Sequence, residues 1–292
     1  MRSQSRTSRQ WTTGAVLEWT AAYFREKGIP SARLDAEVLL ADALEVDRVQ
    51  LYLDLERPLL SSERDRYREL VKRRALREPT ALITGIKEFW SIPFRIVPGV
   101  LIPRPETETL VEAVVNEVGT VSSPDILEIG TGSGAVAVAV ATELRLASII
   151  ATDIDFRALQ TAAFNAQETG VSASVRFLAS DLFGAVKPGT RFDVICSNPP
   201  YIASDVIPTL EPEIVNFEPM SALDGGPEGL DIIRRLASEA RDYLKERGAL
   251  ILEIGDRQES SVREIFAAIG IFRDITVARD LAGKVRVVKG KR

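Results

Sequence analysis

The chain has 292 residues, of which 45% are hydrophobic and 27% are charged, and this composition is ordinary for a soluble globular protein of about two domains. It contains no histidine and one cysteine, Cys196, which excludes a Ser-His-Asp triad, a Cys-His pair, a His-ligated metal, a thiolate zinc site and an internal disulfide. The net charge of -5 argues against a nucleic-acid partner, and no apolar run approaches the ~18 residues of a membrane span. We therefore expect neither a metal cofactor nor a membrane partner.

Residues 1–10 are polar and carry Arg2, Arg6 and Arg9 without an acid. They predict a disordered tail on a cytoplasmic protein, and the alternative is a short organellar transit peptide. The single cysteine fits a reducing compartment.

Residues 12–79 carry apolar side chains at helical spacing and predict a small helical domain over residues 1–80. The stretch from Ser62 to Asp65 is typical of a capping box at a helix start. A basic run interleaved with acids follows, consisting of Arg64, Arg66, Arg68, Lys72, Arg73, Arg74 and Arg77. One interpretation of this run is a solvated helix face. The other is a docking surface for an acidic partner, which would make this a substrate-docking domain.

Residues 81–104 alternate apolar and polar side chains between prolines, which predicts a β-hairpin linking two domains. Pro105 then suits the first turn of a helix whose apolar face includes Leu110 and Val114. Arg104 and Glu106 lie in this proline-rich turn, where they either line a substrate path or cap the helix.

From Asp125 onward, strands and helices alternate, which predicts an α/β domain over residues 105–292. We expect strands at 126–129, 147–152, 175–179, 192–196 and 249–254, and a terminal antiparallel pair at 272–278 and 285–288. We expect helices at 135–144, 157–168 and 228–246. The predicted fold class is therefore α/β, with a mixed sheet of about seven strands and a small N-terminal helical domain.

A glycine-rich turn, Gly130-Thr131-Gly132-Ser133-Gly134, joins the first of these strands to its helix, where glycine lets the backbone approach a ligand closely. Asp153 lies 19 residues beyond Gly134, at the end of the next strand, and this spacing suits a carboxylate that accepts both hydroxyls of a ribose. No lysine follows the glycines, so a phosphate-binding P-loop is not supported. Loop and carboxylate together predict nucleoside binding.

Asp181 ends the third strand and is followed by Leu182. A carboxylate in this place can accept a hydrogen bond from an exocyclic amine, so these two residues are candidate adenine contacts. Capping of a helix is the alternative for Asp181.

The strand at 192–196 runs into Ser197-Asn198-Pro199-Pro200-Tyr201. Proline stops a strand and fixes its own φ, and a residue before proline is held extended, so this loop is nearly rigid. It follows the carboxyl end of its strand, where ligands of open α/β sheets bind. Its amide, carbonyls and aromatic ring predict a clamp for a planar amide or amine. Core packing is the alternative for Tyr201.

The glycine loop, the ribose carboxylate and the Asn-Pro-Pro-Tyr sequence together resemble S-adenosylmethionine-dependent methyltransferases that act on exocyclic or amide nitrogen. Further motifs narrow the resemblance to the HemK/PrmC family of protein-(glutamine-N5) methyltransferases, which act on peptide-chain release factors. These motifs are Glu88-Phe89-Trp90, Ile102-Pro-Arg-Pro-Glu-Thr-Glu108, Phe217-Glu-Pro219, Ala222-Leu-x-Gly-Gly226 and Asp280-Leu-Ala-Gly283. The chain departs from the family's usual pattern at three places. Glu128 stands where Asp is common, and Met220 stands where Arg is common. In Lys284-Val285-Arg286 the arginine comes one position later than is usual.

The resemblance implies a Rossmann-like fold, with S-adenosyl-L-methionine as cofactor and S-adenosyl-L-homocysteine as product. The methyl acceptor would be the glutamine of a Gly-Gly-Gln motif in release factors. Cofactor contacts are expected from the glycine loop, Asp153, Asp181, Leu182 and Asn198. Substrate contacts are expected from Asn198, Pro199, Pro200, Tyr201, Arg104 and Glu106.

In this mechanism, the Asn198 side-chain oxygen and the Pro199 carbonyl each accept one N–H of the glutamine amide, and Tyr201 packs on the amide plane. The two acceptors orient the nitrogen lone pair and stabilise the charge that develops on it. The reaction needs no histidine or metal, and we expect a monomer.

Two other functions remain open. An adenine-N6 methyltransferase on DNA or RNA would use the same loop on an exocyclic amine, but the acidic net charge argues against it. A binding module would use the nucleoside pocket only to sense a ligand, and the intact Asn198–Tyr201 loop argues against that.

Overall fold

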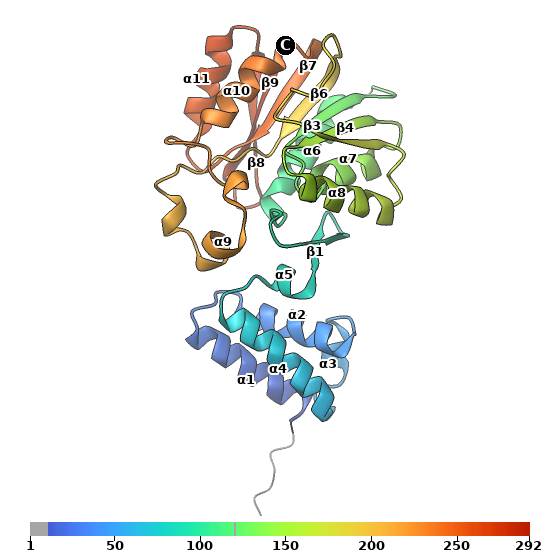
Figure 1. Cartoon of the computed structure of the whole chain (residues 1–292), viewed down its shortest axis with the longest axis vertical. Helices are drawn as coiled ribbons and strands as arrows, with labels where there is room; N and C mark the ends of the chain where they lie inside the picture. The colour runs from blue at the N-terminus through green and yellow to red at the C-terminus, as the bar shows by residue number, and fades with distance from the viewer. Residues whose placement is uncertain (1–10, 120) are drawn as a thin grey trace, which may run out of the picture. The chain divides into compact units, whose positions relative to one another are not determined.

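The computed structural model describes residues 11–119 and 121–292 (Figure 1). The chain divides into two units, Met1–Gly85 and Ile86–Arg292. The tail or transit peptide that the sequence predicts for residues 1–10 lies outside the described residues.

The N-terminal unit is helical, as the sequence predicts. It contains α1 (Thr13–Glu26), α2 (Ala32–Leu44), α3 (Gln50–Leu53), α4 (Ser61–Ala75) and α5 (Thr80–Thr84). Leu17 and Phe24 of α1 and Leu39 and Leu40 of α2 are fully buried, and they form the centre of the unit's own hydrophobic core. Buried alanines lie three or four residues from these side chains, Ala21 in α1 and Ala36 and Ala43 in α2, so one face of each helix is apolar.

Two details of this unit differ from the sequence interpretation. The first turn of α4 is closed by Glu63 rather than by a Ser62–Asp65 box, because Glu63 Oε2 accepts a hydrogen bond from the Leu60 backbone N–H at 2.9 Å. Arg74 of the basic run is buried, and its Nε donates to Asp35 Oδ2 at 2.7 Å. The basic run is therefore not one uniform solvated face.

The second unit begins with the hairpin of β1 (Ile86–Phe89) and β2 (Ile92–Arg95), which pair antiparallel. Trp90 and Ser91 form the turn with φ of 54° and 56°, as a type I′ turn requires. Glu108 Oε1 accepts from the Trp90 backbone N–H at 2.9 Å, and Glu143 Oε1 accepts from Trp90 Nε1 at 2.8 Å. These contacts stabilise a backbone conformation that tryptophan rarely adopts.

The main sheet has seven strands in the order β5-β4-β3-β6-β7-β9-β8, which confirms the predicted mixed sheet. Strands β3 (Asp125–Ile129), β4 (Ser148–Asp153), β5 (Val175–Ala179), β6 (Phe192–Ser197) and β7 (Leu244–Glu253) are parallel. Strands β8 (Arg273–Arg279) and β9 (Val285–Lys291) are antiparallel additions at one edge. The fold is the Rossmann-like methyltransferase fold that the sequence predicts.

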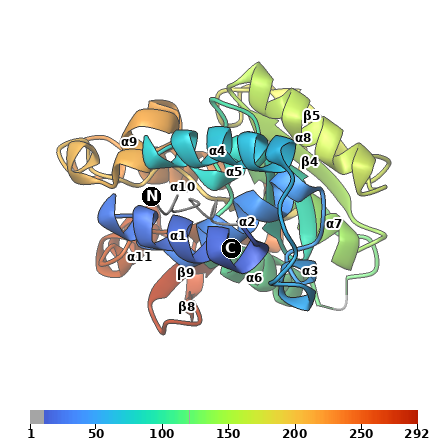
Figure 2. The same ribbon diagram turned by 90° about the horizontal axis from the view of Figure 1, so that it is seen from below.

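Helices cover both faces of this sheet, which is why its central strands read as apolar runs. Helices α7 (Ala135–Glu143) and α8 (Phe156–Glu168) lie on one side, and α10 (Asp231–Ala240) and α11 (Glu259–Ile269) lie on the other, in both views (Figures 1 and 2). Helix α6 (Glu108–Val118) packs on α7 and on β6 and β7. Short elements η1 (Pro105–Thr107), η2 (Ile207–Thr209), α9 (Pro212–Phe217) and η3 (Met220–Ala222) lie in the connections.

The helix predicted at 228–246 was too long. Helix α10 ends at Ala240, and β7 already begins at Leu244, whose buried side chain lies opposite Phe192 in the sheet. The register then jumps from Phe192–Leu244 to Val194–Ala249, so residues 245–248 form a bulge. Lys245 fixes this bulge by donating to Asp125 and Asp193 at 2.8 and 2.9 Å.

Across residues 11–119 and 121–292, every helix is too short or too polar to cross a membrane.

Candidate functional site

A cavity of about 330 Å³ lies at the carboxyl ends of β3, β4, β5 and β6. The chain leaves β3 toward β4 and β5 on one side and continues with β6 on the other side of β3. Such a reversal of strand order opens a crevice, and ligands of doubly wound sheets bind there. Predicted residues from the glycine loop, the strand ends and the proline loop meet in this cavity, namely Gly130, Gly132, Asp153, Asp181, Leu182, Asn198, Pro199 and Pro200.

The glycine loop is held by backbone hydrogen bonds to the neighbouring strand. The Gly130 and Thr131 N–H groups both donate to the Thr152 carbonyl, at 2.8 and 2.9 Å. Gly134 has φ of +82°, and a Cβ at this position would lie 2.9 Å from the Ala162 Cβ of α8. Gly134 therefore serves close packing of helix α8 against the loop, while Gly130 and Gly132 face the cavity.

The two polar side chains of the glycine loop are buried below it. The Thr131 hydroxyl donates to Glu128 Oε2 at 2.6 Å, and the Ser133 carbonyl accepts from Asn165 Nδ2 at 2.9 Å. Among the described residues, the lining of the cavity does not include Thr131, Ser133 or Gly134. These three predicted cofactor residues therefore support the conformation of the loop and do not line the cavity.

Glu128 is a carboxyl group buried under this loop, with a side chain only 2% exposed. Its Oε2 also accepts from the Ala137 N–H of α7 at 3.1 Å, so it joins the loop to the first turn of that helix. Burial raises the pKa of Glu128 to about 8, against the opposing effect of these two hydrogen bonds. At neutral pH this group is largely protonated.

Asp153 ends β4 with its carboxylate facing the cavity. Its Oδ2 accepts from the Gly132 N–H at 2.8 Å and its Oδ1 accepts from the Asp155 N–H at 2.9 Å, which fixes the plane of the group. Burial raises its pKa above the ordinary value, and these backbone donors partly offset the rise. A carboxylate has about four acceptor positions, so two remain for ligand hydroxyls.

Asp181 and Leu182 lie at the other end of the cavity. Asp181 Oδ2 accepts from Arg235 Nη2 of α10 at 3.0 Å, and both side chains are open to solvent. Leu182 is buried and has φ of +46°, a left-handed conformation that is uncommon for leucine. The chain thus turns sharply where it meets the cavity.

The proline loop, residues 198–201, continues β6 and is supported from behind. Its first turn is tied to β3 by Ser197, whose hydroxyl donates to the Ile129 carbonyl at 2.6 Å. Gln258 Nε2 donates to the Tyr201 carbonyl at 3.0 Å. Gly225 lies so close that a Cβ there would be 2.7 Å from the Pro200 carbonyl oxygen. The loop is therefore fixed by contacts as well as by its prolines.

Asn198 presents its side chain at the cavity, where its Nδ2 donates to Thr107 Oγ1 at 3.2 Å. This bond places the amide NH2 against Thr107, so the amide oxygen is turned away from Thr107. Tyr201 packs against the hydrophobic core, and its hydroxyl donates to Glu253 Oε1 at 3.3 Å. Burial raises the pKa of Tyr201 well above its ordinary value.

The described lining of the cavity leaves out three predicted substrate residues: Tyr201, Arg104 and Glu106. Arg104 Nη2 forms an ion pair with Glu218 Oε1 at 2.5 Å, and the Glu218 side chain is 1% exposed. Burial raises the pKa of Glu218, although the Arg104 charge opposes the rise. This pair ties the proline-rich turn to the segment before Pro219, which lines the cavity. Glu106 is exposed.

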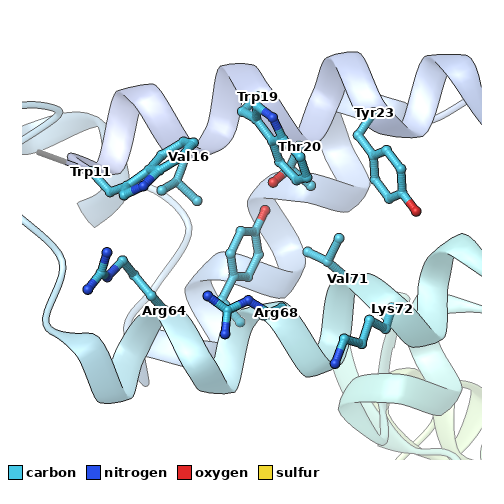
Figure 3. Close-up of a pocket in the computed structure, with 10 residues that line it drawn as sticks. Trp11, Val16, Trp19, Thr20, Tyr23, Arg64, Arg68, Val71 and Lys72 are labelled. Carbon is cyan, nitrogen blue, oxygen red and sulfur yellow. The ribbon is translucent and has the colours of Figure 1, made fainter. Parts of the chain in front are cut away.

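The N-terminal unit has a separate groove of about 350 Å³ between α1 and α4, here called the α1–α4 groove (Figure 3). One wall carries the aromatic side chains of Trp11, Trp19 and Tyr23, and Trp19 stacks on Tyr23 with ring centroids 5.3 Å apart. Trp19 is nevertheless 50% exposed. The opposite wall carries the cations of the basic run, Arg64, Arg68 and Lys72 (Figure 3).

Comparison with known proteins covers both units. The family model described as "PrmC N-terminal domain" matches residues 15–85, and "Methyltransferase small domain" matches residues 105–217. The release factor glutamine methyltransferase of Rhodopirellula baltica is 41% identical over 282 residues, which are 95% of this chain and 95% of that protein. That of Geobacter sulfurreducens is 41% identical over 281 residues, which are 96% and 97%. This chain belongs to the release factor glutamine methyltransferase family.

Solved structures share the fold of this family member at lower identity. A methyltransferase from Pyrococcus furiosus is 20% identical with a TM-score of 0.51, covering 70% of this chain and 91% of that one. The hMettl16 catalytic domain in complex with MAT2A 3'UTR hairpin 6 is 17% identical with a TM-score of 0.58, covering 76% and 81%. At these identities the likeness concerns the fold alone.

The three departures from the usual pattern of the release factor glutamine methyltransferases have different surroundings. Glu128 lies under the glycine loop, and Met220 is 55% exposed. Arg286, which stands one position later than the usual arginine, pairs with Asp280 Oδ2 at 2.8 Å. Burial raises the pKa of both Tyr201 and Glu253, and the Arg286 charge opposes this rise. The shift therefore leaves an arginine charge beside the proline loop.

Sequence reasoning missed Thr107 and Glu253, which contact the proline loop from beneath. The sequence does contain a signal for Glu253, because it is an acid inside the apolar run Ala249–Ile254. Like Asn198, it also lies at the carboxyl end of a predicted strand. Thr107 carried none, since a threonine beside a helix start is ordinary. Arg235 was also missed, because only the folded chain brings α10 to the cavity.

Proposed function

We propose that this protein transfers a methyl group from S-adenosyl-L-methionine to the side-chain amide nitrogen of the glutamine in the Gly-Gly-Gln motif of peptide-chain release factors. The observation that carries the proposal is that Asn198 and Pro199 line a nucleoside-sized cavity, with the NH2 end of the Asn198 amide held by Thr107. The 41% identity to release factor glutamine methyltransferases over nearly the whole chain supports this choice of acceptor. We propose that the protein acts as a monomer in the cytoplasm.

The cavity fits the cofactor in size and in chemistry. Its volume of about 330 Å³ lies within the range of ligand pockets, and its walls combine apolar surface with a few polar groups. Asp153 would accept the ribose hydroxyls, the glycine-loop backbone at Gly130 and Gly132 would lie against the cofactor, and Asp181 with Leu182 would contact the adenine. When bound, S-adenosyl-L-methionine supplies an activated methyl group on a positively charged sulfur.

The chain's own part in the reaction is to hold the substrate nitrogen. The glutamine amide offers two N–H groups, and we assign one to the Asn198 side-chain oxygen and the other to the Pro199 carbonyl. An amide nitrogen is a poor nucleophile because its lone pair is delocalised, so fixing its orientation lowers the barrier. The two acceptors also stabilise positive charge that develops on the nitrogen. The surplus amide proton leaves to water, so no side chain must act as a base.

Tyr201, Arg104 and Glu106 have supporting places in this proposal. Tyr201 holds the end of the proline loop, with its ring packed against the core. Arg104 positions the segment before Pro219 through Glu218. Exposed Glu106 would meet the substrate chain at the start of α6.

We further propose that the N-terminal unit docks the release factor through the α1–α4 groove. The groove combines aromatic surface with Arg64, Arg68 and Lys72, and this chemistry fits an acidic, partly apolar surface of the partner. Arg68 and Lys72 pair with exposed acids of the same helix, Asp65 and Glu69. Such exposed pairs contribute little free energy, so a partner's carboxylates can replace them.

Changing Arg64, Arg68 and Lys72 to glutamate together tests this docking. The variant is expected to raise the KM for a release factor and to weaken its salt dependence, with unchanged cofactor affinity. The matched control changes Arg145, Lys187 and Arg191 to glutamate; these exposed cations line neither the groove nor the cavity and give the same change in net charge. Equal KM values for the two triple variants would refute the docking role.

Incubation with radiolabelled cofactor tests the proposed activity. The protein is offered a release factor, the same factor with its Gly-Gly-Gln glutamine changed to alanine, or duplex DNA. Label on the first substrate alone is the expected result. Label on DNA would favour the adenine-N6 activity instead, and label on the glutamine variant would refute the assigned acceptor.

A further inference from the structure

A row of side chains connects Asn198 to a buried carboxyl group. Asn198 Nδ2 donates to Thr107 Oγ1 at 3.2 Å, and Thr107 in turn lies beside Glu253, whose pKa its side chain lowers. The Tyr201 hydroxyl donates to the same carboxyl group at 3.3 Å. Thr107 is 4% exposed and Glu253 is 1% exposed, so the row is shielded from water. Both ends of the proline loop are thus joined to one group.

The direction of these hydrogen bonds follows from the chemistry of the groups. A carboxylate can only accept, and a hydroxyl has one proton to give. Thr107 can therefore give its proton to an ionised Glu253 but not to Asn198 Nδ2, and its oxygen accepts from Asn198. Only the NH2 end of the Asn198 amide can donate, so the oxygen end is turned away from Thr107.

This direction matters because an asparagine amide has two ends of similar shape. If the Asn198 side chain turned by half a revolution, its NH2 would point where its oxygen is needed. That NH2 could not accept a hydrogen bond from the N–H of a substrate amide, because two hydrogen-bond donors would then face each other. A fixed orientation of the Asn198 amide is therefore a condition for substrate binding in the reactive pose.

We propose that Thr107 and Glu253 are positioning residues that hold the Asn198 amide with its oxygen toward the substrate nitrogen. The inference rests on the proposed function, which places a glutamine amide at Asn198. Thr107 and Glu253 lie below the proline loop and act through Asn198.

The placement of Glu253 supports this role. It ends an apolar strand in which residues 249–252 are fully buried, and burying a carboxyl group there is unfavourable for stability. The Tyr201 hydroxyl donates to Glu253 Oε1 and Thr107 lies beside the group, and both side chains contact or form the proline loop. The other Glu253 oxygen, Oε2, has no hydrogen-bond partner among the described residues. A hydrophobic side chain at position 253 would suit the apolar strand, but it could not orient Thr107.

Protonation of Glu253 would weaken the arrangement. Burial raises the pKa of Glu253 to about 7; Thr107, Tyr201 and the Arg286 charge lower it, and the Glu106 charge raises it. Arg286 is itself paired with Asp280. A protonated Glu253 can donate to Thr107, whose own proton is then free to point at Asn198. We therefore expect turnover to fall as the pH drops through about 7.

The test uses Thr107→Val, which keeps the shape of the side chain and removes the hydroxyl, with Thr107→Ser as the conservative variant. Thr107→Val is expected to lower kcat on a release factor about tenfold or more, as loss of one oriented hydrogen-bonding group does, with unchanged cofactor affinity. Thr107→Ser is expected to restore most of kcat. Thr161→Val is the control, because Thr161 is also a buried threonine on a helix and lies outside the cavity lining.

A second readout needs no methyl acceptor and so separates this inference from the proposed function. The side-chain NH2 signals of Asn198, assigned by their loss in Asn198→Asp, are followed by NMR. We expect slow hydrogen exchange in the parent protein and in Thr107→Ser, and fast exchange in Thr107→Val. Unchanged exchange in Thr107→Val, or unchanged kcat where the parent methylates a release factor, would overturn the inference.

Discussion

The glycine loop after β3 and the proline loop after β6 face the same cavity, but they are built from residues with opposite backbone properties. Gly130, Gly132 and Gly134 all have positive φ, at 75°, 55° and 82°, so the first loop can bend tightly and expose its backbone. Pro199 and Pro200 make the second loop stiff, and it presents oxygen acceptors. The first loop suits a ligand that is gripped along its length, and the second suits one group held in a fixed direction.

The two loops are also anchored differently. The glycine loop is fixed mainly through its own backbone N–H groups, which donate to the Thr152 carbonyl and to the Asp153 carboxylate. The proline loop is fixed by side chains from distant parts of the chain, among them Thr107, Gln258 and Glu253. We therefore expect changes in the first loop to affect cofactor binding and folding, and changes in the second to affect turnover.

The largest effect is expected from Asn198→Ala. It removes the acceptor that we assign to the substrate amide, and loss of one preorganised hydrogen-bonding group of this kind lowers kcat by roughly 10²–10³. Cofactor affinity by calorimetry is expected to change far less. Turnover close to that of the parent protein would remove Asn198 from the mechanism.

Asp153→Ala should instead weaken cofactor binding and leave kcat at saturating cofactor largely unchanged. Hydrogen bonds to a charged group contribute about 1.5–3 kcal/mol, so we expect the Kd for the cofactor to rise about 10–100-fold. At saturating cofactor, kcat should recover most of its value. Asp242→Ala is the control, because it removes one exposed carboxylate elsewhere. An unchanged Kd in Asp153→Ala would contradict the ribose role.

Gly134→Ala separates close packing from backbone strain. Alanine in a left-handed conformation costs about 1–2 kcal/mol, and here its Cβ would also lie 2.9 Å from Ala162. Gly170→Ala is the matched control, since Gly170 has φ of +77° and no atom within 4 Å of the added Cβ. Denaturant unfolding should show a larger loss for Gly134→Ala, by about 1 kcal/mol or more. Equal losses would mean that the contact with α8 is unimportant.

The effect of Glu128→Gln depends on pH. Burial raises the pKa of Glu128 from 4.5 to about 8, so the folded chain keeps a proton that the unfolded chain releases. This contribution to stability is complete below a pH of 4.5 and is lost as the pH rises through about 8.

Glutamine stays neutral at every pH and can keep both hydrogen bonds, which go to one oxygen. From about pH 6 to about pH 9, the melting temperature of the parent protein should therefore fall more than that of Glu128→Gln. Parallel melting curves across this range would contradict the protonated state of Glu128.

Features that depend on neighbours in the sequence could be predicted. The strands at 126–129 and 175–179 follow from short apolar runs, and the glycine and proline loops follow from backbone chemistry at the strand ends. The meeting of Gly130, Asp153 and Asn198 in one cavity follows from the rule that parallel strands share a carboxyl edge.

Features that depend on pairing across the chain could not be predicted. Arg74 looks like its exposed neighbours, and only the packing of α4 on α2 turns it toward Asp35. The end of α10 at Ala240 is set by the pairing of Leu244 with Phe192, which competes with a continuing helical pattern. Thr107 lies 91 positions from Asn198, so no local pattern links them.

Tandem mass spectrometry of a release factor, after incubation with this protein and S-adenosyl-L-methionine, tests the central claim most directly. The account predicts the added mass of one methyl group on the glutamine of Gly-Gly-Gln, with fragments that place it on the side-chain amide nitrogen. The same assay with Asn198→Ala should show little product. An unmodified glutamine, or a methyl group at another residue, would contradict the account.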